Sequence, residues 1–277
     1  MVGIDRRLLQ NVDWPLLGAT FGLFGMSILT LSNLNVGRAG GGIALRQALW
    51  FGVGLIALLV VASLDYRRLV RAAPAVYLLG LTGLVLVSAL GRTVSGARRW
   101  IVLGPMSVQP AEIFKICFVL MAVWVITSRW AQPVGKSTLL MTLPIVAVPF
   151  ALIINQPDLG TALLLFPVLI VLLVTAGMRL RLLGALGVAG LAAVPLAWLV
   201  LRDYQRERIL VFLDPFRDPL GSAYNVIQAK IAIGSGQLLG KGVAGATQSR
   251  LAFLPERHTD FIFAVFAEMW GFVGCLV

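Results

Sequence analysis

Long apolar runs separated by short polar segments dominate the hydrophobic pattern of this chain. Each run approaches the ~20 residues that a helix needs to cross the hydrocarbon core of a bilayer. Polar and apolar residues do not alternate within the runs, which excludes the strands of a membrane-spanning barrel. The pattern therefore predicts an all-α fold, a polytopic transmembrane helix bundle with about eight spans. The spans are expected at Trp14–Leu31, Ala48–Leu64, Ala73–Leu90, Ile113–Thr127, Thr138–Ile154, Thr161–Gly177, Leu182–Leu201 and Phe261–Val277.

The composition agrees with a membrane protein and excludes a soluble domain. Hydrophobic residues make up 59% of the chain and charged residues 13%, with a mean hydropathy of +0.92, whereas a soluble domain carries about 25% charged residues. Cys117 and Cys275 both fall within apolar runs, which argues against a disulfide framework or a metal cluster. We expect residues 1–277 to form a single membrane domain. The last run is still apolar at Val277, which predicts a C-terminally truncated polypeptide.

Basic residues in the loops predict the orientation, because Lys and Arg in short loops favour the cytoplasm. With the N-terminus inside, the inner segments hold nine basic residues and the short outer loops hold five. The long loop at 202–259 adds eight more on the outside, although long loops bear weakly on topology. Such a basic outer face suits an anionic ligand, such as a phosphate or diphosphate headgroup. It equally suits a solvated loop that meets anionic lipid.

The long outer loop at 202–259 is expected to carry structure of its own. Apolar residues in Tyr224–Ile233 predict an amphipathic helix that lies at the membrane interface. Glycines follow densely from Gly234 to Gly245. Three of them fit the spacing of a dinucleotide-binding motif, but no strand precedes them, so we interpret this as a chance match. A loop of this length with its own helix is usually functional.

Charged residues inside or at the edge of a membrane are costly and usually functional. Glu112 and Lys115 lie three residues apart on one face at the start of a span, either as a functional pair or as a simple ion pair. Asp158 opens another span and is either a functional carboxylate or a helix N-cap. Glu268 lies in the middle of the last span, eight residues after Asp260, so the two share roughly one helix face.

Asp260 is the sharpest candidate, because it stands where the long basic loop re-enters the membrane. Partial desolvation at such a boundary makes a carboxylate a stronger base, which suits general-base catalysis. The alternative is an N-cap for the last span. His258, the only histidine in the sequence, is too close in the chain to form a metal site with Asp260. Trp100 follows Arg98 and Arg99, either as an interfacial anchor or as a platform for a sugar ring beside a phosphate clamp.

Five ordered stretches from about Gly96 onward carry a more specific signal. They are Gly96–Ile101 with Gln109–Glu112, Gln156–Thr161, Asp214–Gln228 and Leu254–Phe263. Together they resemble the SEDS family, the shape, elongation, division and sporulation proteins. Pro255–His258 and Lys230–Lys241 are more similar to the RodA branch of that family than to its FtsW branch.

The resemblance implies a family fold of ten spans and a peptidoglycan glycosyltransferase. Such an enzyme polymerises lipid II on the outer face of the bacterial cytoplasmic membrane during cell elongation and releases polyprenyl diphosphate. The resemblance also implies a class B penicillin-binding protein as partner, with no nucleic acid. A divalent cation, Mg²⁺ or Mn²⁺, is compatible with the diphosphate chemistry.

The resemblance further assigns roles to individual residues. The essential aspartate of the family maps onto Asp260, which we expect to be the catalytic base for the acceptor hydroxyl. Positive side chains are expected to stabilise phosphate charge, and the family's loop tryptophan maps onto Trp100. No metal-ligating residue is expected. The expected substrate-binding residues are Trp100, Arg98, Arg99, Lys115, Glu112, Glu256, Arg257, His258 and Asp158.

Two other function classes stay open at this point. A transporter such as a lipid II flippase predicts a charged pathway across the full depth of the membrane, and the mid-depth charges here are few, mainly Lys115 and Glu268. A non-catalytic scaffold for a penicillin-binding protein explains the helices but not the polar outer motifs. We rank the enzyme first, a scaffold role as an addition to it, and the transporter last.

Overall fold

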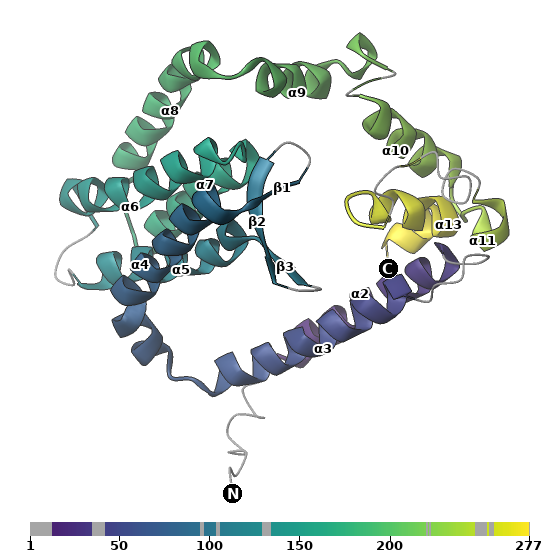
Figure 1. Cartoon of the computed structure of the whole chain (residues 1–277), viewed down its shortest axis with the longest axis horizontal. Helices are drawn as coiled ribbons and strands as arrows, with labels where there is room; N and C mark the ends of the chain where they lie inside the picture. The colour runs from purple at the N-terminus through teal and green to yellow at the C-terminus, as the bar shows by residue number, and fades with distance from the viewer. Residues whose placement is uncertain are drawn as a thin grey trace, which may run out of the picture. The chain divides into compact units, whose positions relative to one another are not determined.

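Helices make up most of the protein in the computed structural model. The structure describes residues 13–34, 42–94, 97–103, 106–128, 134–219, 221, 223–246, 254 and 258–276. The chain divides into two compact units, one formed by Met1–Val61 with Arg206–Val277 and the other by Ala62–Gln205. Figure 1 shows both units with their elements labelled.

Every predicted span is a helix, so the all-α polytopic prediction is confirmed. Six of the helices are long and apolar enough to cross a membrane. The other two, α7 with 17 residues and α13 with 15, are shorter. The eight helices are α2 (Trp14–Leu34), α3 (Gly42–Ser63), α4 (Tyr66–Leu90), α5 (Pro110–Ser128), α6 (Lys136–Asn155), α7 (Leu159–Thr175), α8 (Leu180–Val200) and α13 (Ile262–Leu276).

The unit at 62–205 is built around a bundle of α4, α5, α6 and α7. Phe114 and Phe118 of α5 are fully buried at its centre. The ring of Tyr77 on α4 lies 5.4 Å from the ring of Phe114. Its hydroxyl donates a 2.8 Å hydrogen bond to the carbonyl of Ile145, so the one polar atom of this buried ring is satisfied. Large aromatic side chains on α5 therefore hold the bundle together.

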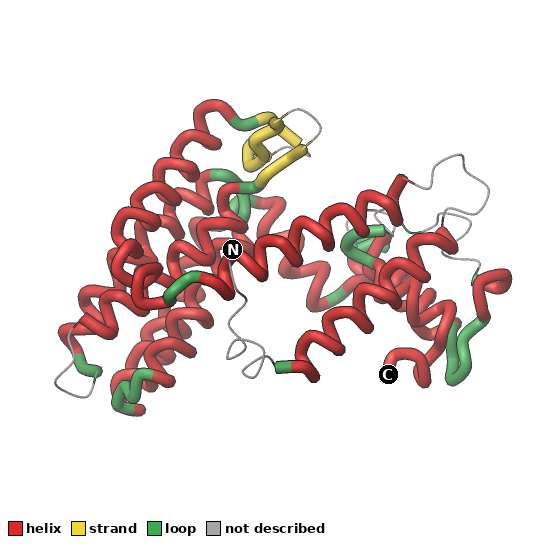
Figure 2. Tube along the Cα trace, turned by 90° about the horizontal axis from the view of Figure 1, so that it is seen from below, coloured by secondary structure: helices red, strands yellow, loops and turns green. Residues whose placement is uncertain are grey.

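A small sheet stands at one end of this bundle (Figure 2). It consists of β1 (Arg92–Val94), β2 (Ala97–Leu103) and β3 (Met106–Val108), all antiparallel and in that order. On β2, Trp100 lies opposite Arg92 of β1 and Ile101 lies opposite Val108 of β3. The sequence predicts an outer loop here, so the sheet is a feature that the apolar pattern does not reveal.

In the other unit, the long outer loop contains more helix than expected. It holds α9 (Asp203–Leu213), whose first residues belong to the neighbouring unit, the 3-10 turn η1 (Pro215–Arg217), α10 (Tyr224–Ser235) and α11 (Gly242–Gly245). The predicted helix at Tyr224–Ile233 is thus confirmed as α10. It packs on α13 through buried Ala229 and Ala232, whereas its larger side chains Ile231 and Ile233 are exposed.

The glycine-rich segment after α10 supports a break in α13. Gly271 leaves the helical conformation, with φ 65° and ψ −167°. On either side of this break, the carbonyl of Gln237 accepts a hydrogen bond from the N–H of Phe272 at 2.8 Å, and the N–H of Lys241 donates to the carbonyl of Glu268 at 3.0 Å. Backbone groups that the break leaves without helical partners are paired in this way. The dense glycines allow the two backbones to come this close.

We expect Gly236→Ala to destabilise the protein. A methyl group at this position would collide with the carbonyl oxygen of Ala267 on α13, and overpacking of this kind costs about 1–3 kcal/mol. Gly234 provides a matched control, because it lies two residues earlier, inside α10, with open space around its Cα. Gly234→Ala should leave the free energy of unfolding unchanged or raise it by up to about 1 kcal/mol.

Chemical unfolding of both variants in detergent micelles measures this difference. Equal free energies of unfolding for Gly236→Ala and Gly234→Ala would show that the close approach to α13 does not stabilise the fold.

Candidate functional site

The expected site residues fall into two groups, one in each compact unit. Arg99, Trp100, Glu112, Lys115 and Asp158 belong to the unit at 62–205, and His258 and Asp260 belong to the other. Glu256, Arg257 and the side chain of Arg98 lie outside the part of the chain that the structure describes. Each group is therefore described by itself.

Asp158 is a buried carboxylate, only 8% exposed, in the turn between α6 and α7. One of its oxygens accepts the N–H of Thr161 at 3.3 Å, which caps the first turn of α7. The N-cap interpretation of Asp158 is therefore confirmed. A negative charge at a helix N-terminus also interacts favourably with the helix dipole.

The same carboxylate connects two further segments to α7. The side-chain amide of Gln109, the residue before α5, donates a 2.7 Å hydrogen bond to its second oxygen. The guanidinium of Arg99 on β2 lies 3.6 Å from that oxygen and forms an ion pair with it. We call Asp158, Gln109 and Arg99 the Asp158 cluster. Two helices, α5 and α6, separate the sheet from the α6–α7 turn along the chain, and the cluster brings these two segments together at one end of the bundle.

Gln156 is a second buried polar residue in this turn, and the sequence analysis did not single it out. It is 2% exposed, and its amide donates to the carbonyl of Leu84 at 2.9 Å and to the hydroxyl of Ser88 at 3.3 Å. The sequence does carry a signal for Gln156, because a polar side chain that directly follows an apolar span indicates a buried hydrogen-bonding residue. Two buried atoms beside these contacts, Nε of Arg99 and Oε1 of Gln156, have no hydrogen-bond partner among the described residues.

Trp100 follows Arg99 directly on β2 and is half-buried. Successive side chains of a strand point to opposite faces of the sheet. This alternation is interrupted at Arg99, because the register with β1 shifts from Trp100 opposite Arg92 to Arg98 opposite Thr93 and leaves Arg99 as the extra residue of a bulge. The two residues were expected to contribute to one sugar and phosphate site, and in the structure the guanidinium of Arg99 is directed at Asp158.

Glu112 and Lys115 form an ion pair in the first turns of α5, with a distance of 2.7 Å between Nζ and Oε2. The ion-pair interpretation is therefore confirmed. Both side chains are partly exposed, 54% for Glu112 and 31% for Lys115. An exposed pair of this kind contributes about 0–1 kcal/mol to stability. An ammonium group has three donors, so Lys115 can contact Glu112 and a second anion at once.

Asp260 and His258 are exposed in the turn that leads into α13. The helix starts at Ile262, and the carbonyl of Phe261 accepts the N–H groups of Ala264 and Val265. Asp260 therefore stands two residues before Ile262, the first residue of the helix, and is exposed. Glu268 of the same helix is fully buried, as expected for a residue that faces the protein interior.

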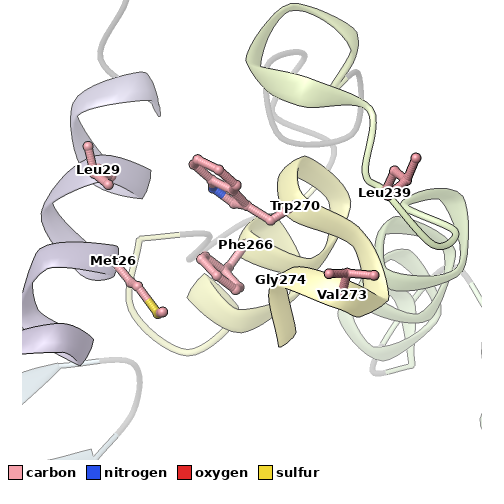
Figure 3. Close-up of a pocket in the computed structure, with 7 residues that line it drawn as sticks. All are labelled: Met26, Leu29, Leu239, Phe266, Trp270, Val273 and Gly274. Carbon is pink, nitrogen blue, oxygen red and sulfur yellow. The ribbon is translucent and has the colours of Figure 1, made fainter. Parts of the chain in front are cut away.

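An apolar cavity of about 480 Å³ lies beside α13 in the same unit (Figure 3). Phe266 and Trp270 of α13 face Met26 and Leu29 of α2 across it, and Leu239 from the glycine-rich segment also lines it. Such a cavity suits a hydrocarbon chain better than a polar group. Across the described ranges, no group of three or more His, Cys, Asp or Glu side chains lies close enough to hold a metal ion.

Comparison with known proteins gives consistent matches over nearly the whole chain. The family model for cell cycle proteins of the FtsW, RodA and SpoVE type matches residues 14–277. The peptidoglycan glycosyltransferase MrdB of Escherichia coli is 42% identical over 256 residues, which cover 91% of this chain and 69% of MrdB. A probable peptidoglycan glycosyltransferase FtsW of Alkalilimnicola ehrlichii is 34% identical over 279 residues, 97% of this chain and 69% of that protein.

Solved structures agree with these sequence matches. A chain from a peptidoglycan synthase complex, described as coordinating polymerization and crosslinking, superimposes with a TM-score of 0.72 at 32% identity and covers 96% of this chain and 73% of its own length. The rod shape determining protein RodA of Thermus thermophilus superimposes with a TM-score of 0.64 at 26% identity, over 96% of this chain and 70% of that one.

The buried contacts of Gln156 lead to a prediction about stability. Gln156→Met keeps the side-chain length but removes the hydrogen bonds to Leu84 and Ser88. The free energy of unfolding should fall by about 1–3 kcal/mol, because each net hydrogen bond contributes about 0.5–1.5 kcal/mol. Ser88→Ala is the control, since it keeps the 2.9 Å hydrogen bond from Gln156 to Leu84. It removes the 3.3 Å contact and the 3.1 Å bond from the Ser88 hydroxyl to the Leu84 carbonyl, leaves the buried amide paired, and should cost less. Unfolding in detergent micelles measures both, and a Gln156→Met protein as stable as the wild type would contradict the prediction.

Proposed function

The chain belongs to the FtsW, RodA and SpoVE family of cell cycle proteins, its activity is that of a peptidoglycan glycosyltransferase, and we propose that it polymerises lipid II with Asp260 as the catalytic base. The observation that carries the activity is the match to this family over residues 14–277. The identity to MrdB, 42%, is above the identities of 34–39% to FtsW relatives, and with the resemblance of Pro255–His258 to the RodA branch it favours a role in cell elongation.

The chemistry of the reaction explains why one carboxylate can be sufficient. The donor sugar leaves with polyprenyl diphosphate, which is already a good leaving group and needs no acid catalyst. The acceptor hydroxyl is a poor nucleophile, and a general base accelerates its attack by about 10²–10⁴-fold. The exposed position of Asp260 before α13 supports this role, because an acceptor hydroxyl can approach the carboxylate directly.

Positive side chains stabilise the negative charge of the diphosphate. We assign this role to Arg98 and Lys115. Lys115 is partly exposed, and its pair with Glu112 holds the ammonium in place. A divalent cation, Mg²⁺ or Mn²⁺, would enter with the diphosphate, because Mg²⁺ commonly binds through substrate phosphates and few protein carboxylates. Trp100 would provide a platform for a sugar ring, with Glu256, Arg257 and His258 shaping the acceptor side.

The apolar cavity beside α13 is proposed to take the polyprenyl tail. Asp260 precedes α13, and Phe266, Trp270 and Val273 line the cavity at increasing distance from it along the helix. A helix rises about 1.5 Å per residue, so Phe266 and Trp270 lie roughly 9–15 Å along the helix from the carboxylate, and Val273 follows the break at Gly271. A lipid-linked sugar could then hold its headgroup at Asp260 and its tail along α13.

We assign the protein to the bacterial cytoplasmic membrane, with its N-terminus in the cytoplasm and Asp260 outside. The distribution of basic loop residues supports this orientation. A class B penicillin-binding protein is the proposed partner, since the matching chain comes from a peptidoglycan synthase complex that is described as coordinating polymerization and crosslinking. A scaffold role would add to the enzyme activity. The flippase alternative loses support, because Lys115 is paired near one end of α5.

Asp260→Asn should slow polymerisation strongly while the protein still folds and binds its partner. The amide cannot accept the proton from the acceptor hydroxyl, so the rate should fall by about 10²–10⁴-fold. Asp214→Asn is the matched control, because Asp214 is an exposed carboxylate of the same outer loop that caps η1, and Asn caps as well as Asp.

The measurement is glycan-chain formation from purified lipid II in the presence of the partner, with the partner also assayed alone. Glycan ladders from Asp260→Asn at the wild-type rate would remove Asp260 from the role of base. If the wild-type protein forms no ladders where a reference polymerase does, lipid II polymerisation itself is wrong.

Leu29→Trp should distinguish the tail site from the headgroup site. The larger ring would fill part of the 480 Å³ cavity between α2 and α13. The KM for lipid II with a long polyprenyl chain should rise, whereas the KM for a short-chain analogue should change little. Leu16→Trp, at an exposed position of α2 away from the cavity, is the control. An equal effect on both substrates would argue against a tail in this cavity.

A further inference from the structure

We propose that Asp158 and Arg99 are positioning residues, which fix β2 and the Trp100 side chain on the end of the helix bundle. The inference refines the proposed function, because Trp100 is the residue assigned there to a sugar ring. It also gives Arg99 and Asp158 a role different from the substrate contact expected from the sequence.

The guanidinium of Arg99 is poorly placed to bind a diphosphate. Its Nη1 faces Asp158 at 3.6 Å, and its Nε is buried. Recognition of phosphate by Arg usually needs two parallel N–H donors that the anion can reach. Since one donor edge is buried and another donor is directed at a carboxylate, Arg99 is better suited to an internal contact than to a substrate contact.

Asp158 is a rigid anchor for that contact. Its carboxylate is buried, accepts the N–H of Thr161, and accepts a second hydrogen bond from Gln109 at 2.7 Å. A side chain held by a helix terminus and by a neighbouring amide has little freedom to follow a moving partner. The ion pair with Arg99 therefore restrains the sheet rather than the helix.

The geometry of the sheet transmits this restraint to Trp100. Arg99 and Trp100 are consecutive residues of β2, and Trp100 pairs with Arg92 while Ile101 pairs with Val108. The first part of β2 is paired with β1 and its last part with β3, so rotation of the strand at Trp100 would break the ladder with β1 and strain the ladder that begins at the next residue. Arg99 directly precedes Trp100 at the register shift between β1 and β2, so its contact with Asp158 holds the backbone from which the ring of Trp100 extends.

Gln109 extends the same restraint to the start of α5. It directly precedes this helix, whose first turn contains Glu112, the partner of Lys115. The Asp158 cluster therefore orients two neighbouring elements that carry expected substrate contacts. Removing the charge of Asp158 should loosen both without breaking the cap of α7.

Asp158→Asn is the central variant, because Asn caps a helix as well as Asp but carries no charge for Arg99. Arg99→Gln removes the same ion pair from its other end, and the double variant completes a cycle. Asp65→Asn is the matched control. Asp65 caps α4 by accepting the N–H of Arg67 at 2.9 Å, outside the Asp158 cluster.

The first readout is the environment of Trp100 without any turnover. The protein is labelled with 5-fluorotryptophan in detergent micelles, and the Trp100 resonance is assigned by its loss in Trp100→Phe. We expect this ¹⁹F resonance to shift or broaden in Asp158→Asn and in Arg99→Gln but not in Asp65→Asn. An unchanged resonance in both cluster variants overturns the proposal, whether or not the protein polymerises lipid II.

The second readout is the kinetics of polymerisation. Each single variant should raise KM for lipid II by about fivefold, the effect of losing one partly exposed ion pair, with kcat nearly unchanged. The double variant should resemble the singles, because the two residues act through one contact. A loss of kcat at constant KM, or strictly multiplicative effects in the double variant, overturns the positioning role. Absence of turnover in the wild type rejects the proposed function, and the ¹⁹F resonance then decides the positioning role alone.

Discussion

Backbone hydrogen bonding in an apolar medium is the constraint on which this structure depends. Lipid cannot bond to an amide or a carbonyl, so a break in a membrane helix must be satisfied by protein. At Gly271 in α13, the segment after α10 pairs with the backbone on both sides of the break. After α6, the side chain of Asp158 caps the next helix. The irregular segments are therefore ordered for the same reason that the spans are helical.

Charged side chains follow a related rule, because an unpaired charge is costly where water is scarce. Asp158 is paired with Arg99 and Glu112 with Lys115, both in the unit at 62–205. Asp260 differs from these carboxylates, since it is exposed at the start of α13. A paired carboxylate is already occupied as an acceptor, whereas an exposed one is available to a substrate hydroxyl. The contrast supports positioning roles for the paired carboxylates Asp158 and Glu112 and a chemical role for Asp260.

The sequence predicts the helices well because length and apolar composition are local properties of each span. It also predicts the helix N-cap formed by Asp158 and the ion pair between Glu112 and Lys115. Both were among the alternatives, because an N-cap and a pair three residues apart in a helix are local features. The sheet at 92–108 was missed, because its short strands are defined by pairing with one another and by contacts to α4 and α5. The glycines at 236–240 had no local explanation either, since their role depends on contact with α13.

The arrangement along α13 connects the fold to the proposed chemistry. A lipid-linked sugar has an apolar tail that must stay in or near the membrane and a polar headgroup that must reach water. Asp260 lies exposed just before this helix, and an apolar cavity lies along it. The break at Gly271 lies between two cavity-lining residues, Trp270 and Val273, and the glycine-rich segment that supports it contributes Leu239 to the same cavity. The contacts that repair the helix therefore also shape the surface on which we place the substrate tail.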